Sequence, residues 1–252
     1  MPRDARNRSE SGIYHIMLRG INRQNVFEDE QDIERLLETI KKYKEVSKCE
    51  IYAYCIMTNH FHMLVKEVDE SISDTIKRIS SSYVFWYNKK YERCGHLFQE
   101  RFKSETVEND EYFLIVLRYI HQNPMKAGIV KDIAQYKWSS YREYIGKPNI
   151  ISPDFALDMF SPNRKSSIEL FCSFNNQKNS DMCLEDDKKA RVSDVELKQL
   201  LFKLGVIDSK ELKNQDKNKR NEIVRKLKEV NGVTVRQLSR ITGLSKSQIG
   251  RI

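Results

Sequence analysis

The 252-residue sequence lacks the long apolar runs that mark membrane-spanning and secreted proteins. Its longest strongly apolar run covers residues 113–117, whereas a helix that crosses a bilayer needs about 20 apolar residues. Residues 1–6 open a polar stretch with no apolar segment behind it, so a secretory signal is not expected. The sequence therefore predicts a cytoplasmic protein with no membrane partner.

Cysteine is scarce and scattered. The five cysteines form no C-x-x-C pair, and their odd number does not suit a disulfide framework. They are Cys49, Cys55, Cys94, Cys172 and Cys183. Neither a cysteine-built zinc site nor a disulfide-stabilised fold is expected. The cysteine pattern instead predicts a protein of a reducing compartment.

The sequence has no excess of negative charge, and its positive excess is confined to one end. The formal net charge is +8, from 44 Lys and Arg against 36 Asp and Glu. Residues 1–216 hold 34 of each sign, so the whole excess lies in residues 217–252, which carry ten basic and two acidic side chains. Charge concentrated in this way is typical of a nucleic-acid-binding surface, although a solvated basic face would have the same composition.

Residues 1–146 alternate between strand-like and helix-like segments. Apolar runs and period-two alternation predict strands at residues 13–18, 51–57, 60–66 and 102–107. Helical periods predict helices at residues 29–47, 71–91 and 109–123, the last of them ended by Pro124. This order predicts an α+β fold, a ferredoxin-like domain in which an antiparallel or mixed sheet carries helices on one face.

The remaining residues divide into a connector and a second module. Residues 147–216 are irregular and interrupted by prolines, and they predict a connector with short helices near 153–160 and 193–204. In residues 217–252, Thr234 and Ser245 can cap two short helices on either side of a glycine turn, which is a helix-turn-helix pattern. A small dimerisation module is the alternative interpretation. The exposed side chains of Lys246, Gln248 and Arg251 are candidate DNA contacts.

His60-Phe61-His62 is the most informative tripeptide. Residues two apart on a strand point the same way, so both imidazoles would face one site. Two neutral imidazoles can hold a divalent cation. A pair of structural histidines would leave the same pattern.

Tyr119 and Asn123 lie four residues apart on the third predicted helix, and therefore on one face of it. The amide oxygen of Asn123 could complete a three-ligand metal set with His60 and His62. Tyr119 would then place a phenol near the metal. The alternative is a core tyrosine beside a helix-ending Asn-Pro.

Together these groups describe a reaction at a phosphodiester. A metal would bind a non-bridging oxygen and stabilise the developing charge. The tyrosine could then attack phosphorus and retain the strand as a phosphotyrosine. Ionising a phenol of pKa about 10 at pH 7 costs about 4 kcal/mol, so activation is needed.

Five ordered blocks resemble the HUH single-tyrosine transposases, and more closely the repeat-associated (REP-associated) tyrosine transposases. They are residues 19–24, 57–62, 95–104, 118–124 and 138–141. The resemblance implies a catalytic Tyr119, and Mg²⁺ or Mn²⁺ bound by His60, His62 and Asn123. Residues 217–252 resemble, less specifically, the helix-turn-helix of the replication initiator DnaA.

The resemblance also implies the substrate and the polarity of cleavage. The substrate would be single-stranded DNA with a hairpin, cut to leave a 5′-phosphotyrosine and a free 3′-hydroxyl, while the C-terminal module would bind duplex DNA. The family usually has proline where this chain has Thr58, which we expect to alter the stiffness of a turn. Candidate phosphate contacts in the domain are Arg19, Asn22, Arg23, Arg101 and Lys103.

Three alternatives stay open at this point. The chain could be a DNA-binding regulator with reduced catalysis, a replication-initiator-type HUH nickase, or a metal-stabilised protein without activity. The sequence is compatible with a monomer or a homodimer.

Overall fold

The computed structural model describes residues 7–99, 101–184, 194–206, 212, 215–230 and 233–252. Residues 1–6, which opened the polar N-terminus, lie outside this set, as do residues 185–193 of the predicted connector. The chain divides into two compact units, residues 1–184 and 185–252. This boundary differs from the predicted ones at 146 and 216, because residues 150–183 share the core of the first unit and Leu197 shares that of the second.

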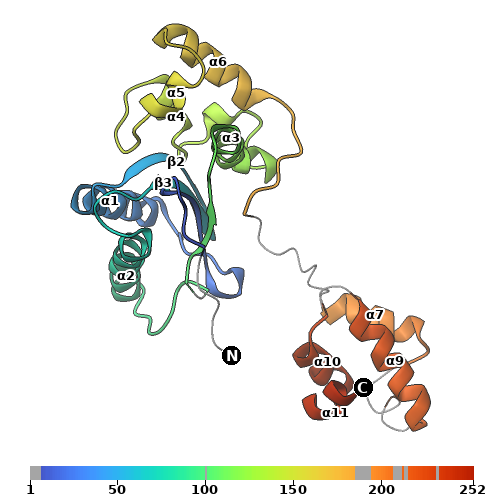
Figure 1. Cartoon of the computed structure of the whole chain (residues 1–252). Coiled ribbons are helices and arrows are strands. Elements are labelled where there is room, and N and C mark those ends of the chain that lie inside the picture. Colours follow the sequence, from blue (N-terminus) through green and yellow to red (C-terminus); the bar gives the residue numbers. More distant parts are fainter. Residues whose placement is uncertain (1–6, 100, 185–193, 207–211, 213–214, 231–232) are drawn as a thin grey trace. The chain divides into compact units, whose positions relative to one another are not determined.

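A four-stranded antiparallel sheet forms the centre of the first unit (Figure 1). Its strands are β1 (Ile13–Arg19), β2 (Glu50–Met57), β3 (His60–Lys66) and β4 (Lys103–Thr106). Their order across the sheet, β2-β3-β1-β4, is that of a ferredoxin-like domain. The predicted α+β class is therefore confirmed.

Helices cover both faces of this sheet, rather than the one face that the sequence predicts. Helices α1 (Glu30–Ser47) and α2 (Ile72–Lys90) pack together on one face, and α3 (Asp110–Lys126) lies on the other (Figure 1). The reason is that β1, β2 and β3 are buried at nearly every residue, so both faces require cover. Helix α3 also continues past Pro124 by half a turn, with the Ala127 amide bonded to the Asn123 carbonyl.

The segment after α3 packs against α3 and against β2. It contains α4 (Tyr141–Ile145), α5 (Asp154–Asp158) and α6 (Arg164–Asn176), together with a short 3-10 helix at Ile133–Gln135. Phe171 of α6 stacks on Tyr144 with ring centroids 4.3 Å apart. Buried His121 bonds through its two ring nitrogens to Asn175 and Ser140. Helix α6 was not predicted from the sequence.

The loop between β1 and α1 includes a 3-10 turn, Ile21–Arg23, and is hydrogen-bonded to the turn between β2 and β3. The Gly20 amide donates to the Asn59 carbonyl at 2.8 Å, and the Val26 amide donates to the Thr58 carbonyl at 3.0 Å. Thr58 therefore lies in the predicted turn, where it anchors the loop. This packing holds the β1 loop beside the start of β3.

Replacing Gly20 with alanine should destabilise the first unit by about 1–3 kcal/mol. A Cβ at Gly20 would lie 2.2 Å from the Gln24 carbonyl oxygen and 2.7 Å from Val26 Cγ1, so the loop would have to move. Urea unfolding of Gly20→Ala measures the loss. Gly250→Ala is the control, since its Cβ would meet no atom within 4 Å. Equal unfolding midpoints for Gly20→Ala and the wild type would contradict this account of the loop.

The second unit is a small helical domain with its own apolar core. The helices among its described residues are α7 (Asp194–Lys203), α9 (Lys217–Glu229), α10 (Val235–Thr242) and α11 (Lys246–Arg251). The predicted turn between α10 and α11 has Gly243 at a φ of 68°, a conformation that favours glycine. Ser245 caps α11 in a reciprocal arrangement with Gln248. Across the residues described, none of the helices has the length and apolarity to span a membrane.

Candidate active site

The register of three strands brings the predicted site residues of the sheet together. His60 of β3 lies opposite Arg19 of β1, and His62 lies opposite Met17. Residues directly opposite each other in an antiparallel pair point to the same face. The two histidine rings are 5.1 Å apart between centroids. Both therefore face the side of the sheet that α3 covers.

Each of these imidazoles is held through its Nδ1 atom. His60 Nδ1 lies 2.6 Å from the Asn59 side-chain oxygen, and His62 Nδ1 lies 3.0 Å from His15 Nε2. The Nε2 atoms are consequently the ones that a ligand would meet. His62 is only 2% exposed, while His60 is half-buried and gives access to the pair.

Burial keeps both imidazoles uncharged at neutral pH. Burial, together with repulsion from the nearby Arg19 guanidinium, lowers the pKa of His60 to about 4. Burial also holds the pKa of His62 well below its usual range, with added repulsion from His15, His60 and Arg19. A neutral imidazole has the lone pair that a metal ion requires.

Helix α3 places Tyr119 against the histidines. The Tyr119 ring centroid is 5.8 Å from that of His62 and 5.8 Å from that of His15, with edge-on packing in both cases. Its side chain is 8% exposed, and Lys126 Nζ lies 5.1 Å from its ring centroid. Tyr119 is thus near the histidine pair, as the reaction outlined above requires.

Asn123 follows Tyr119 by one turn of α3. Its amide nitrogen donates to the Tyr119 carbonyl at 3.0 Å, so its side chain is bonded to the helix rather than to either histidine. This bond uses the amide nitrogen and leaves the amide oxygen as a candidate ligand.

Two imidazoles and an amide oxygen form a mixed nitrogen and oxygen set that a divalent ion can use. In the part of the chain that the structure describes, no three side chains of His, Cys, Asp or Glu are grouped as metal ligands. His60, His62 and Asn123 would therefore hold an ion together with oxygens from substrate or solvent. The donor set fits a divalent ion that accepts both nitrogen and oxygen ligands.

Two of the candidate phosphate contacts lie on the same face as the histidines. Arg19 is the cross-strand partner of His60, and burial followed by repulsion from Arg23 lowers the pKa of its guanidinium. Lys103 of β4 lies opposite Met17, which in turn lies opposite His62. Both cations can therefore orient a phosphate beside the histidines.

Asn22 and Arg23 lie in the loop after β1, and both are exposed. Their φ angles, 53° and 60°, are in the left-handed region that residues with a Cβ rarely adopt. Asn59, the neighbour of His60, donates to the Arg23 carbonyl at 3.1 Å. The loop is thus attached to the edge of the site.

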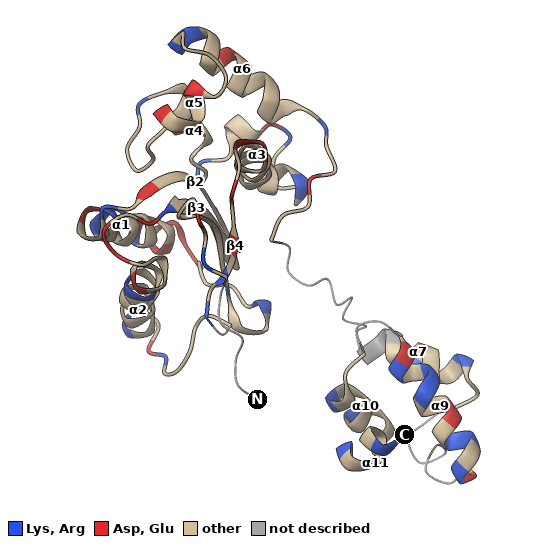
Figure 2. Ribbon diagram, in the orientation of Figure 1, with Lys and Arg blue, Asp and Glu red and all other residues tan. Residues whose placement is uncertain are grey.

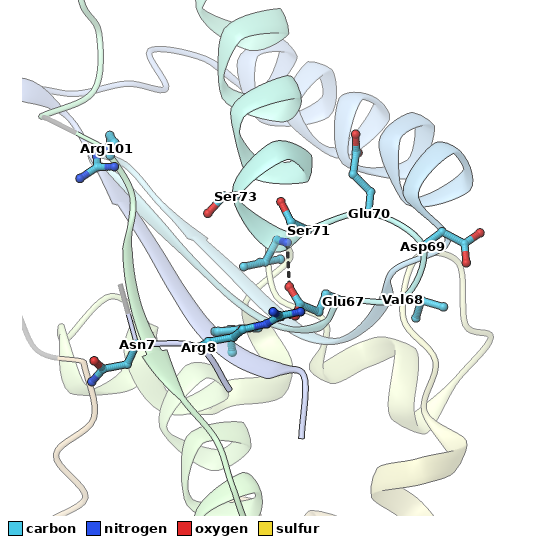
Figure 3. A pocket seen from close by; sticks show the side chains of 11 residues that line it. Asn7, Arg8, Glu67, Val68, Asp69, Glu70, Ser71, Ser73 and Arg101 are labelled. Atoms are coloured by element: carbon cyan, nitrogen blue, oxygen red, sulfur yellow. Dashed lines mark hydrogen bonds between the residues drawn. The ribbon is translucent and has the colours of Figure 1, made fainter. Parts of the chain in front are cut away.

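Arg101 lies elsewhere. It lines a cavity of about 630 Å³ at the N-terminus of α2, together with Arg8, Glu67 and Ser71 (Figure 3). It also lines a second cavity of about 640 Å³ against α2, with Leu18 and Phe98. Leu18 faces the side of the sheet opposite to that of Arg19, so Arg101 is separate from the histidine pair.

His15 and Glu105 were not assigned a role from the sequence. His15 is fully buried and bonded to His62, and Glu105 lies opposite it on β4. Alternation within residues 13–19 does place His15 and Arg19 on one face. The pairing of β1 with β3 and β4 was the missing information.

Comparison with known proteins gives a family match for the first unit. Residues 9–123 match the sequence model described as "Transposase IS200 like". A Haemophilus influenzae protein, provisionally named a REP-associated tyrosine transposase, is 26% identical over 124 residues, covering 42% of this chain and 70% of that protein. A REP-associated tyrosine transposase of Escherichia coli K12 is 24% identical over 116 residues, covering 44% of this chain and 66% of that protein.

A solved structure has the same fold. It is a REP-associated tyrosine transposase bound to a REP hairpin, and it superimposes with a TM-score of 0.51 at 21% identity. The alignment covers 58% of this chain and 87% of that one.

Proposed function

Because residues 9–123 form a domain of the IS200-like transposase family, we propose that this chain cuts and rejoins single-stranded DNA beside hairpins, with Tyr119 as its nucleophile. The observation that carries the proposal is the position of the Tyr119 ring, 5.8 Å from that of His62 in the histidine pair. Such an enzyme would act on DNA in the cytoplasm.

The Tyr119 hydroxyl oxygen would attack phosphorus, and the bond from phosphorus to the 3′ oxygen would break. The phenol proton is lost to solvent and the departing 3′ oxygen gains one, so a 5′-phosphotyrosine and a 3′-hydroxyl result. His60, His62 and Asn123 would hold Mg²⁺ or Mn²⁺, which supplies Lewis-acid stabilisation of charge on the phosphate. Arg19 and Lys103 would orient that phosphate.

The hairpin substrate is supported by the relatives. Two of them are named for REP association, and the structural neighbour is described as bound to a REP hairpin. A regulator without catalysis would need neither a tyrosine ring beside that of His62 nor two neutral imidazoles on one face of the sheet. The proposal is tested by the formation of a covalent adduct between a hairpin oligonucleotide and Tyr119.

The second unit would bind duplex DNA through α11. Lys246, Gln248 and Arg251 are exposed on this short helix, and lysines and arginines recur along α9 and α10 (Figure 2). The Gln248 side-chain oxygen accepts from the Ser245 amide at 2.9 Å, so this residue is already used in capping. Lys246 and Arg251 are accordingly the stronger candidates for phosphate contacts.

The double variant Lys246→Ala/Arg251→Ala should weaken duplex binding while leaving hairpin cleavage unchanged. Each lost phosphate contact removes about 0.9 from the slope of log affinity against log salt, so the slope should fall by about 2. Duplex affinity measured at several salt concentrations gives this slope. Lys165→Ala, which removes an exposed charge from α6, is the control. An unchanged slope would make the second unit an assembly or stability element.

A further inference from the structure

A line of three polar side chains, Glu105, His15 and His62, crosses strands β4, β1 and β3. Glu105 of β4 lies opposite His15 of β1, and Glu105 Oε2 is 3.9 Å from His15 Nδ1. The other ring nitrogen of His15, Nε2, lies 3.0 Å from His62 Nδ1. His15 and His62 are 0% and 2% exposed, so water does not readily replace the contact between them, whereas the Glu105 side chain is 37% exposed.

The hydrogen bond between the two histidines has a direction, and that direction decides what His62 can do. If His62 Nδ1 carries the proton and donates to His15, then neutral His62 has its lone pair on Nε2. If His15 donates instead, His62 carries its proton on Nε2 and cannot bind a cation there. Only the first arrangement makes His62 a ligand.

Glu105 selects the first arrangement. When His15 accepts through Nε2, neutral His15 carries its proton on Nδ1, the atom nearest Glu105. This Nδ1 is buried and has no hydrogen-bond partner in the described contacts, and 3.9 Å is longer than a hydrogen bond. Closing that gap by a small movement of the carboxylate would satisfy the buried donor.

Glu105 is held in place as a charged acceptor. The Leu184 amide donates to its Oε2 at 2.9 Å. The neighbouring His15 imidazole and this amide bring the pKa of Glu105 down to about 2, against some opposition from burial. A carboxylate can only accept, so it cannot favour the reverse tautomer of His15.

We propose that Glu105 and His15 are positioning residues, which hold His62 in the tautomer whose Nε2 lone pair is available to a metal ion. Partners of this kind behind a ligating histidine orient its ring and raise its basicity. The inference rests on the proposed function, in which His62 is a metal ligand. It adds Glu105 and His15 to the proposed metal site, although neither residue would touch the ion or the DNA.

The first test reads the tautomer directly in the metal-free full chain. Nitrogen-15 NMR of histidine-labelled protein distinguishes the two neutral forms, and we expect His62 to be protonated on Nδ1. In Glu105→Ala, which removes the acceptor, we expect the other tautomer to become populated. A wild-type His62 protonated on Nε2 would overturn the inference whether or not the protein binds a metal.

The second test measures Mn²⁺ affinity without DNA, from the EPR signal of the free ion. His15→Leu should weaken binding about 10- to 100-fold, the usual effect of removing such a partner. His15→Gln should restore most of it, because the amide oxygen of glutamine can accept from His62 Nδ1. If His15 had only a packing role, His15→Leu and His15→Gln would bind Mn²⁺ with similar affinity.

The controls separate this inference from the proposed function. His121→Leu removes another fully buried, twice-bonded histidine and should lower stability without changing Mn²⁺ affinity. His60→Ala should abolish binding, and Mn²⁺ binding unchanged by His60→Ala would reject the proposed metal site itself. Wild-type affinity in a folded His15→Leu protein, alongside loss in His60→Ala, would overturn the positioning role alone. If His15→Leu does not fold, Glu105→Ala takes its place in this comparison.

Discussion

Tyr119→Phe should abolish covalent protein–DNA adducts and lower hairpin cleavage by at least about a thousandfold, or about 4 kcal/mol in activation free energy. The substitution removes only the hydroxyl that would attack phosphorus. Phenylalanine keeps the edge-on ring contacts with His15 and His62, so the fold and hairpin affinity should change little. Single-turnover cleavage of a labelled hairpin oligonucleotide with Mn²⁺ present measures the loss.

The matched control is Tyr43→Phe, which removes a tyrosine hydroxyl from α1 on the opposite side of the sheet. Its cleavage rate should equal that of the wild type. Hairpin affinity of both variants, measured with EDTA present, separates catalysis from binding. If Tyr119→Phe still cuts the hairpin at a comparable rate, Tyr119 is not the nucleophile.

Removing the metal ion, or its proposed ligand His60, should reduce cleavage about as much as Tyr119→Phe does. EDTA should stop cleavage by the wild type, and Mn²⁺ should restore it. His60→Ala should lose cleavage at every Mn²⁺ concentration that supports cleavage by the wild type, because the two remaining ligands cannot replace the set of three. His60 is the better choice for this test, since it is half-buried, whereas His62→Ala would also remove the partner of buried His15.

Thermal unfolding gives an independent readout of the same site. An ion present at 100 times its dissociation constant stabilises the folded state by about 2.7 kcal/mol, and Mn²⁺ should therefore raise the melting temperature of the wild type. The shift should be absent from His60→Ala and present in Tyr119→Phe, which retains all three proposed ligands. Wild-type cleavage that continues unchanged in EDTA would contradict the metal site.

The sequence predicts the elements of the first unit well, because each has a clear local pattern. Strict alternation in residues 60–66 places both histidines on one face, and the structure brings their rings to 5.1 Å. Four-residue spacing likewise places Tyr119 and Asn123 on one face of α3. These features depend only on the geometry of one strand or one helix.

Features that depend on pairing between distant segments were not predicted. His15 gains its role only because β1 pairs with β3 on one side and β4 on the other, and no local pattern carries that register. Arg101 belongs to a basic block of sequence near Lys103, yet it lines cavities beside α2. The packing of α6 on α3 is of the same kind, because Phe171 reaches Tyr144 and His121 only in the folded chain.

The central claim is that Tyr119 becomes joined to the 5′ side of a cut DNA strand, and mapping the adduct tests it most directly. The full chain would be incubated with Mn²⁺ and a pool of hairpin oligonucleotides with randomised single-stranded flanks, labelled at the 5′ or the 3′ end. After nuclease and trypsin treatment, mass spectrometry would locate the remaining nucleotide. We expect the 3′ label to stay with the protein, and the nucleotide to lie on Tyr119 in the peptide of residues 119–126. A nucleotide on another tyrosine, or retention of the 5′ label instead, would contradict the account.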